Sequence, residues 1–533
     1  MPFFNKFLEY FRRDKYLYSA VILEAAVVIL MFLGLMPRAS SFYLTAGIML
    51  FMLVLNPLQA MRFFVLSLPW VIALPLNEYD KFQTWRILIF EVFLIAIFYR
   101  RDEFWHSLKK GYRATADFFR LTKIDYAFFA FLGVSLAVLI FNHGFLAPAI
   151  KQAVTYFTLY GIFLTGRLII NSDLDKRALI KDFALSGLTF VAAGFAQLLF
   201  FLRTDSLFFW QYWANSVIPV IYGLEYGRLS SEANTWFAYF PDRLPNLRMF
   251  SLFPGSQVFA QICLLTAPAL LVLREISAKP KQKKMWTVAL WTVLLAAALT
   301  YVRATVVGLF VPLVLLFVFY LFKKISKFIF KKAVYAIVVF FLILIISPLL
   351  QFGINQFSLY ERHGGSLFDR TRAGIDLDYE SNKTRLIIWK QSFESFKDRP
   401  VFGVGAGNYA RVFEAEGSTR TFEEIRESKE AFVNSPRHNI SAHNILLQVL
   451  VESGIIGLVF FLLFLWVLAK RIYELIKSKI GENGIFPRGL FALWLGVAIL
   501  WVLGHSMFDS VFLTDDEPLT FFFINLAILL GSE

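Results

Sequence analysis

A polar stripe headed by a histidine marks the start of an otherwise apolar segment near the C-terminus. If a helix begins near Ser441, one of its faces carries Ser441, Asn444, Gln448 and Glu452. Such a stripe would be unsatisfied against lipid, so it must face the protein interior or a wet cavity. His443 stands at the head of the stripe, where a neutral imidazole can take a proton near neutral pH. We predict that His443 is a general base; the alternative is a histidine that only caps or packs at an interface.

A second histidine, His438, lies five residues earlier. That spacing differs from the i, i+4 pair of a helical zinc site, and no Glu follows His438 as a metalloprotease helix requires. Zinc proteolysis is therefore set aside, and His438 is a weaker candidate than His443. Glu452 is interpreted as a buried polar brace beneath the site. The single cysteine, Cys263, lies inside an apolar run, which leaves neither a disulfide framework nor a cysteine metal site.

Three arginines could bind an anion at one edge of the membrane. Arg303 lies between two apolar runs that are joined by almost no loop, a costly position for a guanidinium unless an anion meets it. Arg385 lies four residues before Trp389, so the two share a helical face, and a guanidinium beside an indole can take two phosphate oxygens. Arg248 is a third candidate on the same side. The alternatives are snorkelling toward lipid phosphates for Arg303 and surface ion pairing for Arg385.

A glycine-rich segment, "VFGVGAGNYARVF", follows Pro400 and contains Gly403, Gly405 and Gly407. These glycines allow tight backbone turns close to a partner or a ligand. The spacing superficially resembles a nucleotide-binding loop, but the strand-to-helix context of such a loop is missing. A nucleotide site is therefore set aside.

The composition indicates that transmembrane helices position these residues. Of 533 residues, 58% are hydrophobic, 18% aromatic and 17% charged, which excludes a soluble domain of this size. Runs of roughly 17 to 25 apolar residues suffice to cross a bilayer as helices. We count about fourteen of them, so the predicted fold class is an all-α polytopic membrane protein. The predicted helices lie near 17–36, 42–57, 63–76, 84–99, 125–146, 150–170, 181–202, 251–273, 286–301, 304–322, 333–350, 443–468, 489–506 and 517–531.

The basic residues give the topology. The net charge of +14 does not indicate nucleic acid here, because Lys and Arg gather in short segments between alternate apolar runs. The positive-inside rule then places both termini in the cytoplasm. Three regions follow: residues 1–350 with the first eleven helices, an outer loop at 351–442, and the last three helices at 443–533.

Two long loops face outward in this topology. The loop at 351–442 has mixed charge and two helical patterns, "SNKTRLIIWKQSFESFKDRP" and "TFEEIRESKEAF", the second opening with a capping box. It is predicted to form a compact, partly helical lid. The loop at 203–250 is dense in Trp, Tyr and Phe, which favours interfacial packing. The alternative is that its rings stack on sugar faces or guide a lipid tail.

Over roughly residues 245–510 the order of motifs resembles the O-antigen ligase and O-antigen polymerase superfamily. The matching motifs are "TYVRATVVGL", "TRLIIWKQSFESFKDRPVFGVGAGNY" and "HNILLQVLVESGIIGLVFFLLFLW", with "RMFSLFPGSQVFAQICLLTAPALL" before and "LGHSMFDS" after. The resemblance implies a GT-C-like bundle and a metal-independent, inverting glycosyltransferase without a cofactor. Such enzymes move a glycan from undecaprenyl diphosphate to an acceptor at the outer face of the bacterial cytoplasmic membrane.

Carried onto this chain, the resemblance implies that Arg303 and Arg385 hold the diphosphate and that His443 activates the acceptor hydroxyl. It also implies that Trp389 and the glycine turn shape the lid, with Glu452 as structural support. This sequence departs from the family's usual Ser-Arg-Gly motif, because Val302 and Ala304 flank Arg303. Three functions therefore remain open: a ligase that transfers the glycan to a glycan, glycolipid or protein acceptor, a polymerase that extends the lipid-linked glycan, and a non-enzymatic flippase or exporter. A flippase requires a continuous polar pathway to the cytoplasmic side, whereas the residues singled out here all lie toward the outer half.

Overall fold

The computed structural model describes residues 14–76, 81–142, 146–224, 236–240, 243–360, 365–373, 380–409, 441–479 and 486–531. Within these ranges the protein is almost entirely helical. Two short antiparallel hairpins are the only strands there: β1 (Ala73–Pro75) pairs with β2 (Lys81–Gln83), and β3 (Phe237–Phe240) pairs with β4 (Arg243–Leu247).

The N-terminal half of the described chain contributes the following helices: α2 (Asp14–Phe32), α3 (Ser40–Met52), α4 (Pro57–Ser67), η1 (Leu68–Trp70), α5 (Thr84–Tyr99), α6 (Arg101–Lys110), α7 (Tyr112–Phe118), α8 (Lys123–Asn142), α9 (Leu146–Ile169), α10 (Asp173–Arg203), α11 (Ser206–Tyr212), η2 (Trp213–Val217) and α12 (Ile218–Tyr222). The C-terminal half contributes α14 (Ser256–Ile276), α15 (Pro280–Leu299), α16 (Arg303–Gly308), α17 (Phe310–Leu321), α18 (Lys327–Gln356), α19 (Leu367–Ala373), α20 (Glu380–Asp398), α23 (Ile445–Lys479), α24 (Arg488–Ser506), α25 (Val511–Thr514) and α26 (Asp516–Leu530).

Each predicted apolar run contains helix, so the all-α, multi-pass membrane fold is confirmed. The run predicted at 63–76 is helical only in its first part, because it ends in η1 and the strand β1. Among the described residues, seven helical segments are long and apolar enough to cross a membrane. They are α2, α10, α14, α16 continued by α17, α18, α23 and α24. The total of about fourteen crossings stays a prediction.

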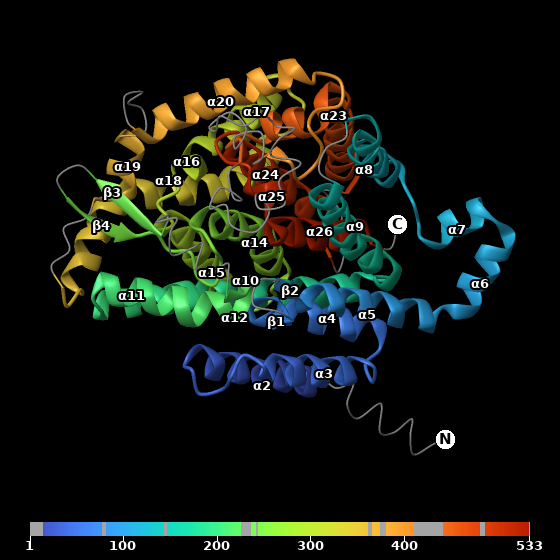
Figure 1. The fold of residues 1–533 in the computed structure, drawn as a ribbon, viewed down its shortest axis with the longest axis horizontal. Helices are drawn as coiled ribbons and strands as arrows, with labels where there is room; N and C mark the ends of the chain where they lie inside the picture. Colours follow the sequence, from blue (N-terminus) through green and yellow to red (C-terminus); the bar gives the residue numbers. More distant parts are fainter. Residues whose placement is uncertain are drawn as a thin grey trace.

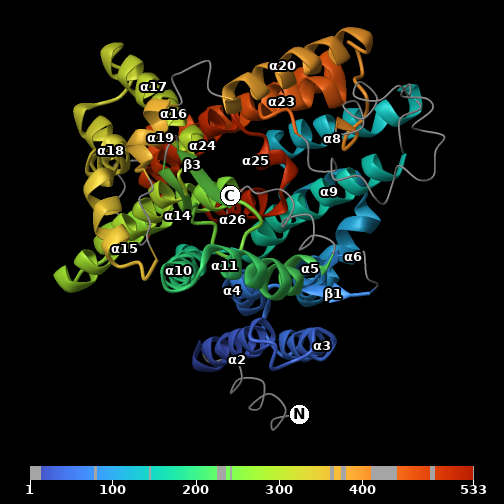
Figure 2. The same ribbon diagram turned by 60° about the vertical axis from the view of Figure 1, so that its left-hand side comes forward.

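The core is built around α14. This helix packs against α10, α15, α24 and α26, and 94% of its most apolar stretch is buried. A helix that is apolar all round is expected in such a central position. Figure 1 shows α14, α24 and α26 in the middle of the molecule, with α20 at one side and the α2–α3 pair at the opposite side. The turned view in Figure 2 shows the same order.

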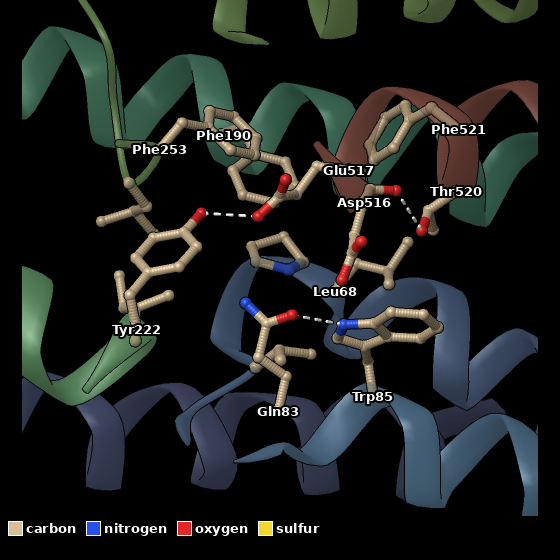
Figure 3. Close-up of a pocket in the computed structure, with 14 residues that line it drawn as sticks. Leu68, Gln83, Trp85, Phe190, Tyr222, Phe253, Asp516, Glu517, Thr520 and Phe521 are labelled. Carbon is tan, nitrogen blue, oxygen red and sulfur yellow. Dashed lines mark hydrogen bonds between the residues drawn. The ribbon is translucent and has the colours of Figure 1, made fainter. Parts of the chain in front are cut away.

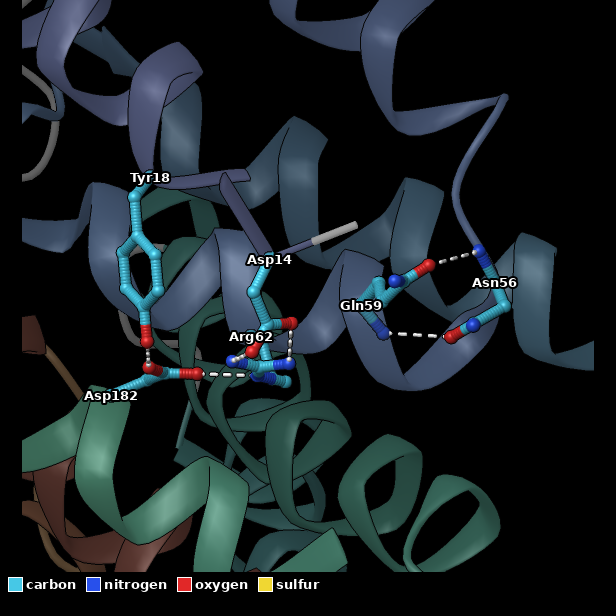
Figure 4. A network of polar contacts seen from close by, with 6 residues as sticks. All are labelled: Asp14, Tyr18, Asn56, Gln59, Arg62 and Asp182. Carbon is cyan, nitrogen blue, oxygen red and sulfur yellow. Dashed lines mark hydrogen bonds and ion pairs between the residues drawn. The ribbon is translucent and has the colours of Figure 1, made fainter. Parts of the chain in front are cut away.

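A polar network ties α2 to the bundle (Figure 4). The guanidinium of Arg62, on α4, donates from Nε to Asp182 Oδ2 on α10 at 2.5 Å and from Nη1 to Asp14 Oδ1 on α2 at 2.7 Å. The Tyr18 hydroxyl, also on α2, donates to Asp182 Oδ1 at 2.7 Å. Asp182 and Arg62 are buried, so loss of either side chain would leave an unpaired buried charge on the other. The network therefore fixes the position of α2 against α4 and α10.

Several predicted boundaries were wrong. α10 begins at Asp173 rather than near 181, because Ser172 and Asp175 form a capping box. α23 continues to Lys479 rather than ending at 468, and it is broken at Gly454, where φ is 63° and ψ is −168°. The helix predicted from "TFEEIRESKEAF" lies outside the described residues.

Candidate functional site

A cavity of about 320 Å³ lies between α14, α16, α19, α20, the start of α23 and the end of α24. Four arginines, one histidine, one carboxylate and one tyrosine supply its charged and titratable groups. The lining residues are Arg248, Gln257, Tyr301, Val302, Arg303, Ala304, Arg370, Thr384, Arg385, His443 and Asp509. The structure thus brings together the three arginines and the histidine that the sequence singled out separately.

Both neighbours of His443 in the chain are held by side chains. The amide of Ala442 donates to Gln448 Oε1 at 2.9 Å, and the carbonyl of Ala442 accepts from Trp389 Nε1 at 3.0 Å. Asn444 caps the start of α23 by accepting from two backbone amides, and its Nδ2 donates to the Met507 carbonyl at 3.1 Å. These contacts hold His443 in a left-handed backbone conformation, with φ at 46°. Trp389 therefore positions His443. The sequence pattern instead predicts its indole beside the guanidinium of Arg385.

Asp509, which follows the end of α24, lies beside His443. Its Oδ2 is 3.9 Å from His443 Nδ1, and its side chain is only 3% exposed. Burial lowers the pKa of His443 below its ordinary value, Asp509 partly offsets this, and Arg385 lowers it further. His443 is therefore neutral at neutral pH, which is the state that a general base requires.

The arginines reach the cavity from different elements. Arg303 begins α16, which is tied to α24 by the Trp501 Nε1 bond to the Thr305 carbonyl at 2.7 Å. Arg248 follows β4, and its Nε donates to the Thr300 carbonyl at 3.3 Å. Arg385 comes from α20. Three separate segments of the chain thus each contribute one arginine to the wall of the same cavity.

The positive charges of these arginines repel one another. Burial and the nearby Arg370 lower the pKa of Arg248 well below its ordinary value. Burial also lowers the pKa of Arg385, although Asp509 raises it in part. An anion placed among the guanidinium groups would offset both the burial and the repulsion. The cavity is therefore suited to a group with more than one negative charge.

The predicted glycine turn packs against the break in α23. Val404 and Gly405 donate backbone N–H bonds at 2.8 Å to the carbonyls of Val451 and Glu452. A Cβ at Gly403 would lie 2.4 Å from the Val451 carbonyl oxygen, so only glycine fits there. The turn thus supports the segment that carries His443.

The predicted polar stripe is buried, but α23 begins at Ile445 rather than near Ser441, so Ser441 and Asn444 precede the helix. Asn444, Gln448 and Glu452 are each at most 9% exposed, and Ser441 is half-buried. Gln448 Nε2 donates to Glu452 Oε1 at 2.8 Å, and the backbone amides of Gly407 and Tyr409 also bond to Glu452. Glu452 therefore links the glycine turn to the helix below His443.

Three further side chains at or near the cavity were not singled out from the sequence. Asp509 and Arg370 line it, and His505 lies buried behind it, with Nδ1 3.3 Å from Thr305 Oγ1. "LGHSMFDS", which contains His505 and Asp509, was noted only as a motif. His438 lies outside the described residues.

Comparison with known families gives one match. Residues 288–462, about a third of the chain, match the family model described as O-antigen ligase. The matched segment contains Arg303, Arg385 and His443. The match confirms the resemblance, supports assignment to the O-antigen ligase family, and indicates glycan transfer of the ligase or polymerase type with a lipid-linked glycan and an acceptor as substrates. A comparison with curated proteins found no match.

Proposed function

We propose that the protein is a glycan ligase of the bacterial cytoplasmic membrane. It transfers an oligo- or polysaccharide from undecaprenyl diphosphate to an acceptor at the outer face, and both of its termini lie in the cytoplasm. The observation that carries this proposal is the single cavity in which four arginines surround His443 and Asp509. A diphosphate is the part of such a donor that the arginines would hold, and a hydroxyl is the part of the acceptor that a neutral histidine would activate.

In the proposed reaction the acceptor hydroxyl oxygen attacks the anomeric carbon of the donor sugar. The bond from that carbon to the diphosphate oxygen breaks, and its electron pair stays on the diphosphate. Arg248, Arg303, Arg370 and Arg385 stabilise the charge that develops there, so neither a metal nor a proton donor is required. Attack from the side opposite the leaving group inverts the anomeric configuration.

His443 takes the proton of the attacking hydroxyl. Its Nδ1 faces Asp509, which leaves Nε2 for the substrate. As the imidazole becomes positively charged, Asp509 stabilises it, in the way that a carboxylate supports a catalytic histidine. Trp389, Asn444 and Gln448 are positioning residues, because they hold the backbone on either side of His443.

The second candidate function is a polymerase, which shares the donor chemistry but uses the lipid-linked glycan itself as the acceptor. Purified protein incubated with isolated lipid-linked glycan alone separates the two. Transfer that appears only when a distinct acceptor is added supports the ligase, whereas longer lipid-linked chains without it support the polymerase. Movement of the intact donor across vesicles without any new glycosidic bond would support the flippase and contradict both.

A further inference from the structure

The last turn of α24 carries a buried histidine that the proposed reaction does not use. His505 is 0% exposed and lies one helical turn after Trp501. Its Nδ1 is 3.3 Å from Thr305 Oγ1, and Trp501 Nε1 donates to the Thr305 carbonyl at 2.7 Å. Two side chains of α24 therefore hold the hydroxyl and the carbonyl of the same residue of α16.

The second ring nitrogen makes His505 costly as a packing residue. In the small cavity of Figure 3, buried polar side chains pair with one another: Tyr222 donates to Glu517 at 2.8 Å, and Trp85 Nε1 donates to Gln83 Oε1 at 2.7 Å. His505 Nε2, in contrast, is buried without a hydrogen-bond partner among the described residues. An apolar side chain of similar size would avoid this cost, so the contact with Thr305 is what the histidine adds.

The helix that receives this contact is short. α16 has six residues, too few to be stable without packing, and it lies against α24 (Figure 2). The two backbones touch, because a Cβ at Gly308 would lie 2.4 Å from the His505 backbone nitrogen and a Cβ at Gly504 would lie 2.6 Å from the Gly308 carbonyl oxygen. Arg303, which lines the cavity, is the first residue of α16 and stands two positions before Thr305. The contacts with α24 therefore set the point from which Arg303 enters the cavity.

The same end of α24 is tied to the segment of the base. The carbonyl of Met507 accepts from Asn444 Nδ2 at 3.1 Å, and Asn444 directly follows His443 in the chain. Asp509, two residues after Met507, has its Oδ2 3.9 Å from His443 Nδ1. One short stretch of chain thus contacts both α16 and the segment that carries His443.

We propose that His505 is a positioning residue that holds Arg303, through Thr305, in place for the diphosphate of the donor. This rests on the proposed function, because the lipid-linked donor is the one assigned there. His505 is not among the residues that line the cavity, so it acts through Thr305 and not on the substrate. A guanidinium binds two phosphate oxygens only in a fixed geometry, so a small shift of α16 weakens that contact without removing any group from the cavity.

The test measures equilibrium binding of undecaprenyl diphosphate to the full-length protein in detergent. His505→Leu keeps a similar volume but removes the contact with Thr305, so we expect binding about threefold to tenfold weaker. Thr305→Val replaces the hydroxyl by a methyl group and should weaken binding equally, and the double variant should be no weaker than either single variant. His106→Leu, at an exposed position on α6, is the matched control and should bind as wild type does. Thermal unfolding checks that each variant is folded, and Thr305→Val carries the test if His505→Leu is not.

Two amide variants separate the hydrogen bond from packing. The amide of Asn reaches about as far from the backbone as Nδ1 of His, whereas the amide of Gln reaches about as far as Nε2. His505→Asn should therefore keep the contact with Thr305 and bind within about twofold of wild type, while His505→Gln should bind as weakly as His505→Leu. If His505→Asn binds no better than His505→Gln, the proposal is overturned.

Arg303→Ala separates this inference from the proposed function. If Arg303→Ala weakens binding while folded His505→Leu and Thr305→Val bind as wild type does, the positioning role fails and the proposed function stands. If the wild-type protein does not bind undecaprenyl diphosphate, the proposed function fails and this inference fails with it. We expect His505→Leu to have no further effect when Arg303 is already Ala; an undiminished effect in that background would also overturn the proposal, because His505 would then act elsewhere.

Discussion

Replacing Asp509 by Asn should move the acid limb of the pH–rate profile to lower pH. The negative charge of Asp509 lies 3.9 Å from His443 Nδ1 and favours the protonated imidazole. Without that charge the pKa of His443 falls further below its ordinary value, so the base stays neutral at a lower pH. The same reasoning gives Arg385→Gln the opposite sign, because removal of a nearby positive charge raises the pKa of His443.

The distance sets the size of this effect. Two unit charges 3.9 Å apart interact by about 1 kcal/mol at the dielectric constant of water and by about 4 kcal/mol at an effective value near 20. His443 keeps 34% of its side chain exposed, which places the expected value near the lower end. The acid limb should therefore move down by about one pH unit, since 1.36 kcal/mol corresponds to one pKa unit.

The assay measures kcat/KM for glycan transfer across the acidic and neutral range, which reports the ionisation of the free enzyme. Asp398→Asn, an exposed carboxylate at the end of α20, serves as the control and should leave the profile unchanged. An acid limb that stays in place or moves up in Asp509→Asn would refute the assignment of His443 as the titrating base.

Three further substitutions test how the site is held. Gly454→Ala would place a Cβ 2.2 Å from the Val401 carbonyl at a φ of 63°, and we expect loss of transfer together with a lower Tm in a thermal melt. Trp389→Phe leaves the buried Ala442 carbonyl without its hydrogen-bond donor, at a cost of about 1 to 3 kcal/mol. We expect kcat to fall at least tenfold while the KM for the glycan donor stays the same. A raised KM for the glycan donor alone would contradict the positioning role. Arg370→Gln should weaken donor binding about tenfold in an equilibrium binding assay, whereas Arg372→Gln, an exposed neighbour on α19, should not.

Two of the residues predicted from sequence, Arg303 and His443, were found through features that are costly unless they have a function. A guanidinium at the membrane edge identified Arg303, and a histidine at the head of a polar stripe identified His443, and both line the cavity. Arg370 lies among many charges in a mixed loop, so its residue type carried no signal. Asp509 is the next-to-last residue of the motif "LGHSMFDS", and only the folded chain shows that it lies beside His443.

The break in α23 could not be predicted from local pattern. The sequence pattern predicts one continuous helix over 443–468, with no sign of a break at Gly454. Instead, the segment after Pro400 packs into the break, where Ile455 N donates to the Pro400 carbonyl at 2.9 Å. Helical periodicity describes neighbours along one helix, whereas this contact joins residues more than fifty positions apart. The membrane fold itself was predictable, because long apolar runs have few other solutions.

The most direct test of the account is His443→Ala in a reconstituted transfer reaction, with binding of the undecaprenyl-diphosphate-linked donor measured in parallel. The account predicts that transfer falls by at least 10²-fold, the lower range for loss of a general base, while donor binding is retained by the arginines. Transfer at the wild-type rate with normal donor binding would contradict it.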